Sequence, residues 1–157
     1  MATTKDEIAA AYPLPVYNYR VQIGPDTIAC TEVSGLSIGF ETTTYKESPT
    51  ASGKAGPRTL HMPAQGNPVK VTLKKGVVRQ TSVKALYGWI SDVKINRVEK
   101  KDLAVDLCDE SGKAIIRWTV RNAFPTKLDA PTFDAKSNDA AIEQMELTGD
   151  SIEITEV

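Results

Sequence analysis

Apolar and polar residues alternate along much of the chain, which is the period of a strand with one buried face. The pattern is clearest in residues 17–23, where Tyr17, Tyr19, Val21 and Ile23 are separated by polar side chains. Further strands are expected at 27–33, 36–45, 69–75, 103–107, 113–121, 141–147 and 151–155. Turn residues at 24–26 and 109–112 would join two pairs of these strands as hairpins.

One segment has a strong helical pattern instead. The helix is expected to begin at Thr81 or Ser82 and to end near residues 95–96, where Asn96 tolerates the left-handed conformation that often closes a helix. Its apolar positions, at helical spacing, are Val83, Leu86, Tyr87, Ile90 and Val93.

The first residues predict an arm rather than part of the sheet. Thr3 or Thr4 is suited to cap a short helical turn that runs through Ala11, and Pro13 and Pro15 then require extended backbone. Residues 1–16 are therefore expected to lead into the fold as an N-terminal arm.

Residues 45–67 predict a long loop extension. Residues 47–67 are rich in Ser, Pro, Ala, Gly and Lys, with a short strand possible at 58–62. A loop of more than about 12–15 residues in a compact domain is usually functional or disordered. The strand before it continues past Phe40 with polar residues, which favours completion of that strand by a neighbouring molecule.

Two irregularities interrupt the strand pattern. Residues 123–125 (Ala-Phe-Pro) are expected to break the ladder and redirect the chain. The apolar phase also slips between Ile142 and Met145, which predicts a bulge or a strand buried on both faces.

These elements predict a mainly β protein with one packed α-helix, either a small β-barrel or two crossed antiparallel sheets. The length of 157 residues is that of a single domain. Trp89 and Trp118 are expected to anchor the core, and the lone Cys30 and Cys108 are interpreted as small buried hydrophobic residues.

Composition argues against several functions. The formal net charge of −1 provides no excess of basic residues for nucleic acid. One histidine and two cysteines are too few for common metal sites, so no cofactor or metal is expected. The acidic N-terminus does not resemble a signal peptide, which predicts synthesis in the cytoplasm, and no apolar stretch is long enough to anchor the chain stably in a membrane.

Candidate chemistry is weak. His61 and nearby carboxylates leave open a small hydrolase or binding domain, but no nucleophile motif accompanies this histidine. Asp109 and Asp134 are better explained as turn residues than as metal ligands. The basic residues Lys74 and Lys75 precede a turn glycine without phosphate-loop spacing.

Several runs, in order along the chain, resemble the tail tube proteins of contractile injection systems. They are residues 32–36, 71–76, 86–90, 117–127 and 134–143. Residues 11–17 and 96–102 are most similar to those of the extracellular particles of the antifeeding and virulence-cassette type.

The resemblance implies a structural protein, not an enzyme, that forms hexameric rings stacked into an inner tube. It implies as partners the sheath, the baseplate with its spike or hub, a tube terminator and protein toxin cargo in the lumen. It also implies a phage tail-like particle that is released from the cell. Both the repeating tube subunit and a ring adaptor near the baseplate fit.

In that family the segment after the long strand contacts the adjacent ring, which corresponds to residues 45–67 here. The candidate contacts between subunits or rings are Thr42, Thr44, Tyr45, Lys54, Arg58, His61, Lys74, Lys75, Arg121, Asn122 and Phe124.

Overall fold

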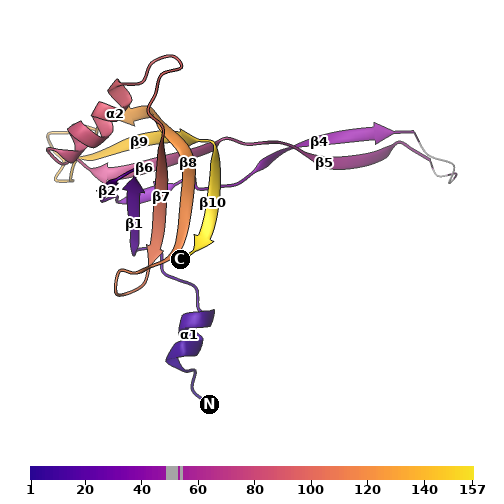
Figure 1. Ribbon diagram of the computed structural model, residues 1–157, viewed down its shortest axis with the longest axis horizontal. Coiled ribbons are helices and arrows are strands. Elements are labelled where there is room, and N and C mark those ends of the chain that lie inside the picture. Colours follow the sequence, from indigo (N-terminus) through magenta and orange to yellow (C-terminus); the bar gives the residue numbers. More distant parts are fainter. Residues whose placement is uncertain (49–52, 54) are drawn as a thin grey trace.

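Strands dominate the computed structural model, which describes residues 1–48, 53 and 55–157 (Figure 1). The strands are β1 (Tyr19–Ile23), β2 (Asp26–Ile28), β3 (Glu32–Ser34), β4 (Phe40–Glu47), β5 (Arg58–Gly66), β6 (Val69–Gly76), β7 (Lys101–Cys108), β8 (Ala114–Asp129), β9 (Ile142–Gly149) and β10 (Ser151–Glu156). The helical segments are α1 (Lys5–Ala11), the π-helical η1 (Ser82–Tyr87) and α2 (Gly88–Ser91).

Eight strands form one folded antiparallel sheet. Their order is β2-β1-β7-β8-β9-β6-β3, and β10 also pairs with β8. The 16-residue strand β8 belongs to both halves: its first part pairs with β7 and β10, and the part from Phe124 onward pairs with β9. The bend lies at Asn122, which has a positive φ of 53°. The bend divides the sheet into two antiparallel halves that share β8. The prediction of two antiparallel sheets is therefore confirmed, and the alternative of a closed barrel is not.

The core lies between the two halves of this sheet and the helical segment. Its fully buried apolar side chains include Val21, Leu103 and Val120 from one half and Val71, Met145 and Leu147 from the other. Leu86 and Trp89 close one end, where Trp89 Nε1 donates to the carbonyl oxygen of Glu99 at 2.7 Å. Trp89 is thus a core anchor as predicted, whereas Trp118 is only half-buried.

Two predicted elements have different bounds. The strand expected at 27–33 is divided into β2 and β3, because β2 pairs with β1 whereas β3 leaves to pair with β6. The helix ends at Ser91, earlier than predicted. Asn96 does adopt a left-handed conformation (φ 57°), but in the tight turn between Lys94 and Arg97.

The two irregularities have a different structural basis from the expected one. β8 runs through residues 123–125 and only bends there, so the ladder is redirected without ending. β9 keeps one register against β6 from Ile142 to Gly149, so the predicted bulge is wrong. The apolar phase slips because the interior position is occupied by Glu143, while Ile142 is exposed.

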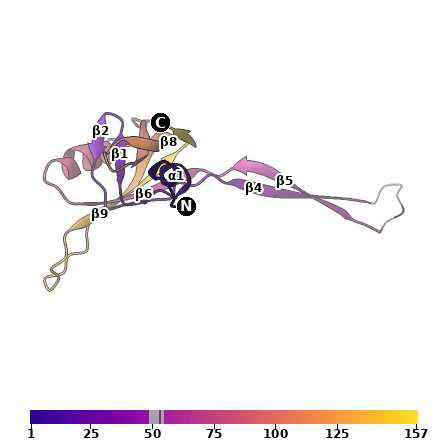
Figure 2. The same ribbon diagram turned by 90° about the horizontal axis from the view of Figure 1, so that it is seen from below.

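The segment expected to be a loop contains a strand. β5 pairs residue by residue with β4 in a separate two-stranded sheet, with one register shift between Phe40 and Thr42. This β4–β5 hairpin projects far from the rest of the molecule (Figures 1 and 2). The short strand considered possible at 58–62 is confirmed, and it continues to Gly66, so the prediction of a loop is wrong for residues 63–66. The backbone groups of this segment pair with a strand that the alternation pattern had already indicated.

Candidate assembly interface

The β4–β5 hairpin is an exposed ribbon with two unlike faces. Its register places Tyr45 opposite Leu60 and Thr43 opposite Met62 on one face. The other face carries Thr44 opposite His61, with 3.3 Å between Thr44 Oγ1 and His61 Nδ1. Because alternate residues of a strand point to opposite sides, one face carries the apolar side chains, with the pair Glu47 and Arg58 at its outer end, and the other face is polar. We call the first of these the apolar face.

The hairpin leaves large apolar side chains in solvent. Phe40 is 61% exposed, Tyr45 50% and Met62 42%. An isolated two-stranded hairpin is only marginally stable in water, and exposed apolar ribbons are sites of association. The hairpin therefore has the properties of a surface that packs against another molecule.

Five of the candidate contact residues lie on this hairpin. They are Thr42, Thr44, Tyr45, Arg58 and His61, all exposed. Arg58 also lies 3.7 Å from Glu47 at the outer end of the ribbon. Lys54 lies outside the described residues.

A second group of candidates lies where β8 bends. Arg121 Nη1 contacts Asp102 Oδ2 at 2.8 Å and its Nη2 contacts Glu153 Oε2 at 2.9 Å. Asn122 donates its backbone N–H to Asp102 Oδ1 at 3.0 Å and its Nδ2 to Asp150 Oδ2 at 2.9 Å. These bonds tie β7, β8 and β10 together at the bend. No motif in the sequence marked Asp102, Asp150 and Glu153 as the partners of these residues.

The electrostatics of this group follow from those bonds. The backbone N–H of Asn122 and the guanidinium of Arg121 hold the pKa of the Asp102 carboxyl below its ordinary value. The side chains of Glu153 and Asp102 raise the pKa of Arg121. Phe124 is half-buried beside the bend, with Lys100 Nζ 5.6 Å from its ring centroid.

Asp102→Asn is expected to destabilise the protein slightly at neutral pH, by less than about 1 kcal/mol, because the ion pair is exposed. A lowered carboxyl pKa stabilises the folded state above the ordinary value of 3.8, and this contribution is lost as the pH falls through the lower, folded value. Urea unfolding at neutral pH and at about pH 3 should therefore show a difference between variant and wild type that shrinks in acid. Glu110→Gln, in the exposed turn after β7, is the control, and an equal pH dependence there would contradict the assignment.

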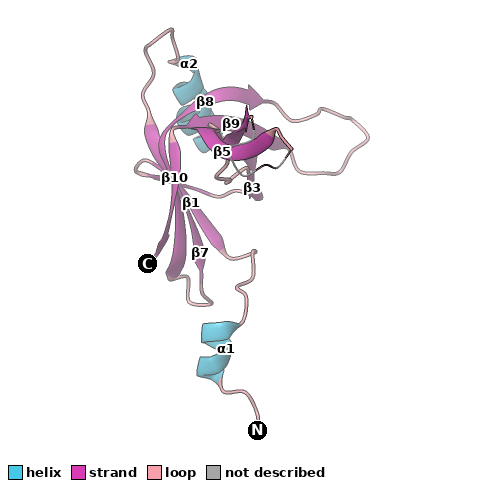
Figure 3. Cartoon of the chain, turned by 90° about the vertical axis from the view of Figure 1, so that its right-hand side faces the viewer, coloured by secondary structure: helices cyan, strands magenta, loops and turns pink. Residues whose placement is uncertain are grey.

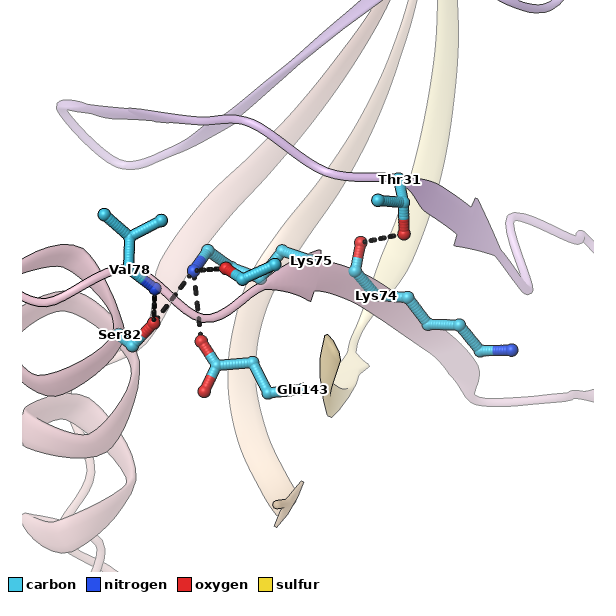
Figure 4. A network of polar contacts seen from close by, with 7 residues as sticks. Thr31, Lys74, Lys75, Val78, Ser82 and Glu143 are labelled. Atoms are coloured by element: carbon cyan, nitrogen blue, oxygen red, sulfur yellow. Dashed lines mark hydrogen bonds and ion pairs between the residues drawn. The ribbon is translucent and has the colours of Figure 1, made fainter. Parts of the chain in front are cut away.

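The two adjacent lysines at the end of β6 have opposite environments (Figure 4). Lys74 is partly exposed and lies 3.5 Å from Glu32. Lys75 is 3% exposed, and its Nζ donates to Glu143 Oε1 at 3.0 Å, Ser82 Oγ at 3.0 Å and the Gly76 carbonyl at 2.7 Å. Lys75 is thus an interior residue, which corrects its assignment as a contact residue; strand alternation from Val71 and Leu73 could have placed it there.

This interior network joins three elements. Ser82 Oγ also accepts the backbone N–H of Val78 at 2.9 Å, so the network connects β6 and β9 to the start of the helical segment (Figure 4). The three protons of the ammonium group all have acceptors, as a buried lysine requires.

The residues considered for catalysis do not form a catalytic arrangement. His61 lies on the projecting hairpin, where its hydrogen-bond partner is the Thr44 hydroxyl. Asp109 Oδ1 accepts the backbone N–H groups of Ser111 and Lys113, and Asp134 Oδ1 accepts that of Lys136, which confirms both as turn residues. Within residues 1–48, 53 and 55–157, no three His, Cys, Asp or Glu side chains are grouped as a metal site would need.

The family model for the T4-like virus tail tube protein gp19 matches residues 15–153. The chain belongs to this tail tube family. Membership confirms the resemblance, and it assigns the chain to structural proteins of tails and tail-like particles rather than to enzymes.

Solved structures extend the similarity to extracellular contractile injection systems. A chain of the PVC sheath-tube complex in the extended state is 36% identical with a TM-score of 0.88, over 99% of this chain and 100% of that chain. A chain of the anti-feeding prophage cap structure (the tube terminating cap) is 38% identical with a TM-score of 0.84, over 100% of both chains. A chain of the PVC sheath/tube terminator is 36% identical with a TM-score of 0.81, over 92% and 97%. No curated protein sequence matches this chain.

Residues 11–17 and 96–102 indicated the extracellular particles of the antifeeding and virulence-cassette type. The similarity to PVC and anti-feeding prophage structures agrees with that prediction. Because the chain belongs to the tail tube family, the alternative of a hydrolase that uses His61 is not supported. Among the described residues, the helices are too short or too polar to cross a membrane.

Proposed function

We propose that this tail tube family member is an inner tube subunit that forms hexameric rings, and that the rings stack into a tube. The observation that carries the proposal is the combination of open strand edges with the projecting β4–β5 hairpin. Within the part of the chain that the structure describes, the sheet order ends at β2 and β3, and β10 pairs on one side only, with β8. Backbone groups at such edges are suited to pair with the next copy.

β10 has the properties of an edge that accepts another strand. It pairs with β8 from Ser151 to Glu156 without a register shift, and it contains no proline. Ile154, on the apolar face, is 56% exposed, so a neighbouring subunit would bury apolar area as well as pair backbone groups.

The polar face of β1, β7, β8 and β10 suits the lining of a lumen. Asp106 receives two hydrogen bonds from Arg117, at 2.6 and 2.9 Å, and Arg121 contacts two carboxylates. Positive and negative groups are thus neutralised in pairs across this face. A wall of this kind allows cargo to pass without strong attraction, and we propose protein toxins as that cargo.

The proposed role in the particle follows from the relatives. The TM-score of 0.88 to a chain of the PVC sheath-tube complex, against 0.84 to a chain of the anti-feeding prophage cap structure, favours the repeating tube subunit, with the terminator as a second candidate. The baseplate chain is only 20% identical, so the ring adaptor is less supported. We further propose that the sheath surrounds this tube and drives it through a target envelope when it contracts, and that the particle is extracellular.

Negative-stain imaging and light scattering of the purified protein test the proposal. Hexameric rings or tubes are expected, and a protein that stays monomeric at high concentration would contradict it.

Tyr45→Asp is expected to weaken ring stacking, because it puts a charge on the apolar face of the hairpin. If the contact between rings buries the Tyr45 side chain, its loss corresponds to about a tenfold higher protein concentration for half-maximal tube formation. Thr44→Asp, on the polar face of the same strand, is the matched control and should have a much smaller effect. Equal effects of the two variants on sedimentation of tubes would remove the apolar face from the stacking contact.

A further inference from the structure

The apolar face of the first half-sheet extends beyond the part that the core covers. Leu103 and Val120 are fully buried, but farther along the same strands Leu107 and Trp118 are only half-buried. Tyr19, Val33, Leu36, Leu107 and Trp118 line an open, mainly apolar groove there, which we call the arm groove. A half-buried tryptophan in such a groove marks a surface that binds another apolar segment.

The helix of the N-terminal arm has exposed apolar side chains. None of the seven residues of α1 is buried, and Ile8 and Tyr12, one helical turn apart, are 39% and 57% exposed. Thr4 and Glu7 cap the first turn reciprocally, with bonds of 3.2 and 2.8 Å. A helix of this length is not stable alone in water even when capped, so the arm needs a surface to pack on.

The arm leaves the domain at the groove but points away from it. Val16 is at the edge of the arm groove, and residues 13–15 (Pro-Leu-Pro) form a stiff extended connection. Figures 1 and 3 show α1 beyond the end of the sheet, on the far side of this connection. In this arrangement α1 does not occupy the groove of its own chain.

The groove is also continuous with the hairpin that we propose as a contact between copies. Leu36 lines the groove, and the chain continues from it through Ile38 and Phe40, which are 60% and 61% exposed. The uncovered apolar surface therefore runs from the arm groove to the base of the β4–β5 hairpin, so one neighbouring copy could cover both.

We propose that the arm of one copy docks into the arm groove of a second copy through Ile8 and Tyr12. The inference rests on the proposed self-assembly, and it assigns the occupant of a surface that the fold alone leaves open. The docked helix would cover Trp118 and Leu107 and would itself be stabilised by the contact. Each copy thus supplies an arm to one neighbour and receives an arm from another.

Cross-linking between chains tests this directly. One chain carries Ala11→Cys, which lies on the same side of α1 as Ile8 and Tyr12, and a differently tagged chain carries Leu36→Cys in the groove. Mixed under assembly conditions and oxidised, they should form a disulfide between the two tags. Ala10→Cys, on the opposite side of the helix, is the matched control. Burial raises the pKa of the native Cys30 thiol to about 11, so this neighbour of the groove competes little for the disulfide.

A second variant measures the contribution of the contact. Ile8→Ser/Tyr12→Ser should raise the concentration needed for half-maximal assembly by about tenfold or more, since it removes two apolar side chains from the groove. It should also shift the fluorescence of Trp118 to the red in the assembled state, while the buried Trp89 stays unchanged.

The outcomes separate this inference from the proposed function. Rings or tubes that form without a cross-link between the tags, or with equal cross-linking from Ala10→Cys, would overturn arm docking and leave the tube function standing. A wild-type chain that never assembles would overturn both.

Discussion

Lys75→Met is expected to lower the free energy of unfolding by about 3–5 kcal/mol, because it leaves the Glu143 carboxylate buried without its partner. The ammonium and carboxylate groups lie 3.0 Å apart, with side chains that are 4% and 9% exposed. For a chain of this size the loss corresponds to a fall of about 10 °C or more in Tm. Differential scanning calorimetry of the unassembled protein measures it.

The neighbouring lysine provides the control. Lys74→Met breaks the exposed pair with Glu32 and should cost less than about 1 kcal/mol. Replacing both interior partners, in Lys75→Met/Glu143→Leu, should recover most of the lost stability, since no unpaired charge is then buried. Equal losses for Lys74→Met and Lys75→Met would show that the buried network does not stabilise the fold.

Gly35→Ala should be similarly damaging, at about 3–5 kcal/mol. Gly35 follows β3 with a φ of +87°, and a Cβ there would overlap the carbonyl oxygen of Lys70 in β6. The methyl group would force β3 away from β6 at the point where the chain leaves for the hairpin. Urea unfolding should show the loss, and hydrogen exchange should show faster opening of the β3–β6 pair.

Gly112→Ala separates the clash from the backbone strain. Gly112 has a comparable φ of +83°, but a Cβ there would meet no atom within 4 Å. It should therefore cost only the left-handed penalty of about 1–2 kcal/mol. Similar losses in the two variants would mean that close approach to β6 is not what requires Gly35.

Most strands could be predicted because their alternation reflects a local rule: one face is buried and the other is not. β1, β6 and β7 lie where this pattern placed them, within one or two residues at each end. The pattern failed where a polar residue occupies an interior position. Glu143 made β9 appear irregular, and the charge of Lys75 pointed to the surface although strand alternation placed it inside. Each residue is acceptable in the interior only through the other, 68 positions away in sequence.

The family, the strand-rich fold and the start of the helical segment could be inferred from the sequence, since they depend on local patterns and on runs of residues in order. Three features became known from the folded structure: Lys75 and Glu143 meet inside, β8 bends at Asn122 into two half-sheets, and residues 58–66 pair with β4 as a projecting ribbon. Each of these depends on which distant segment supplies the hydrogen-bond or ion-pair partner, and a local pattern does not contain that information. The uncovered arm groove is of the same kind, because it exists only where strands from separate parts of the chain come together.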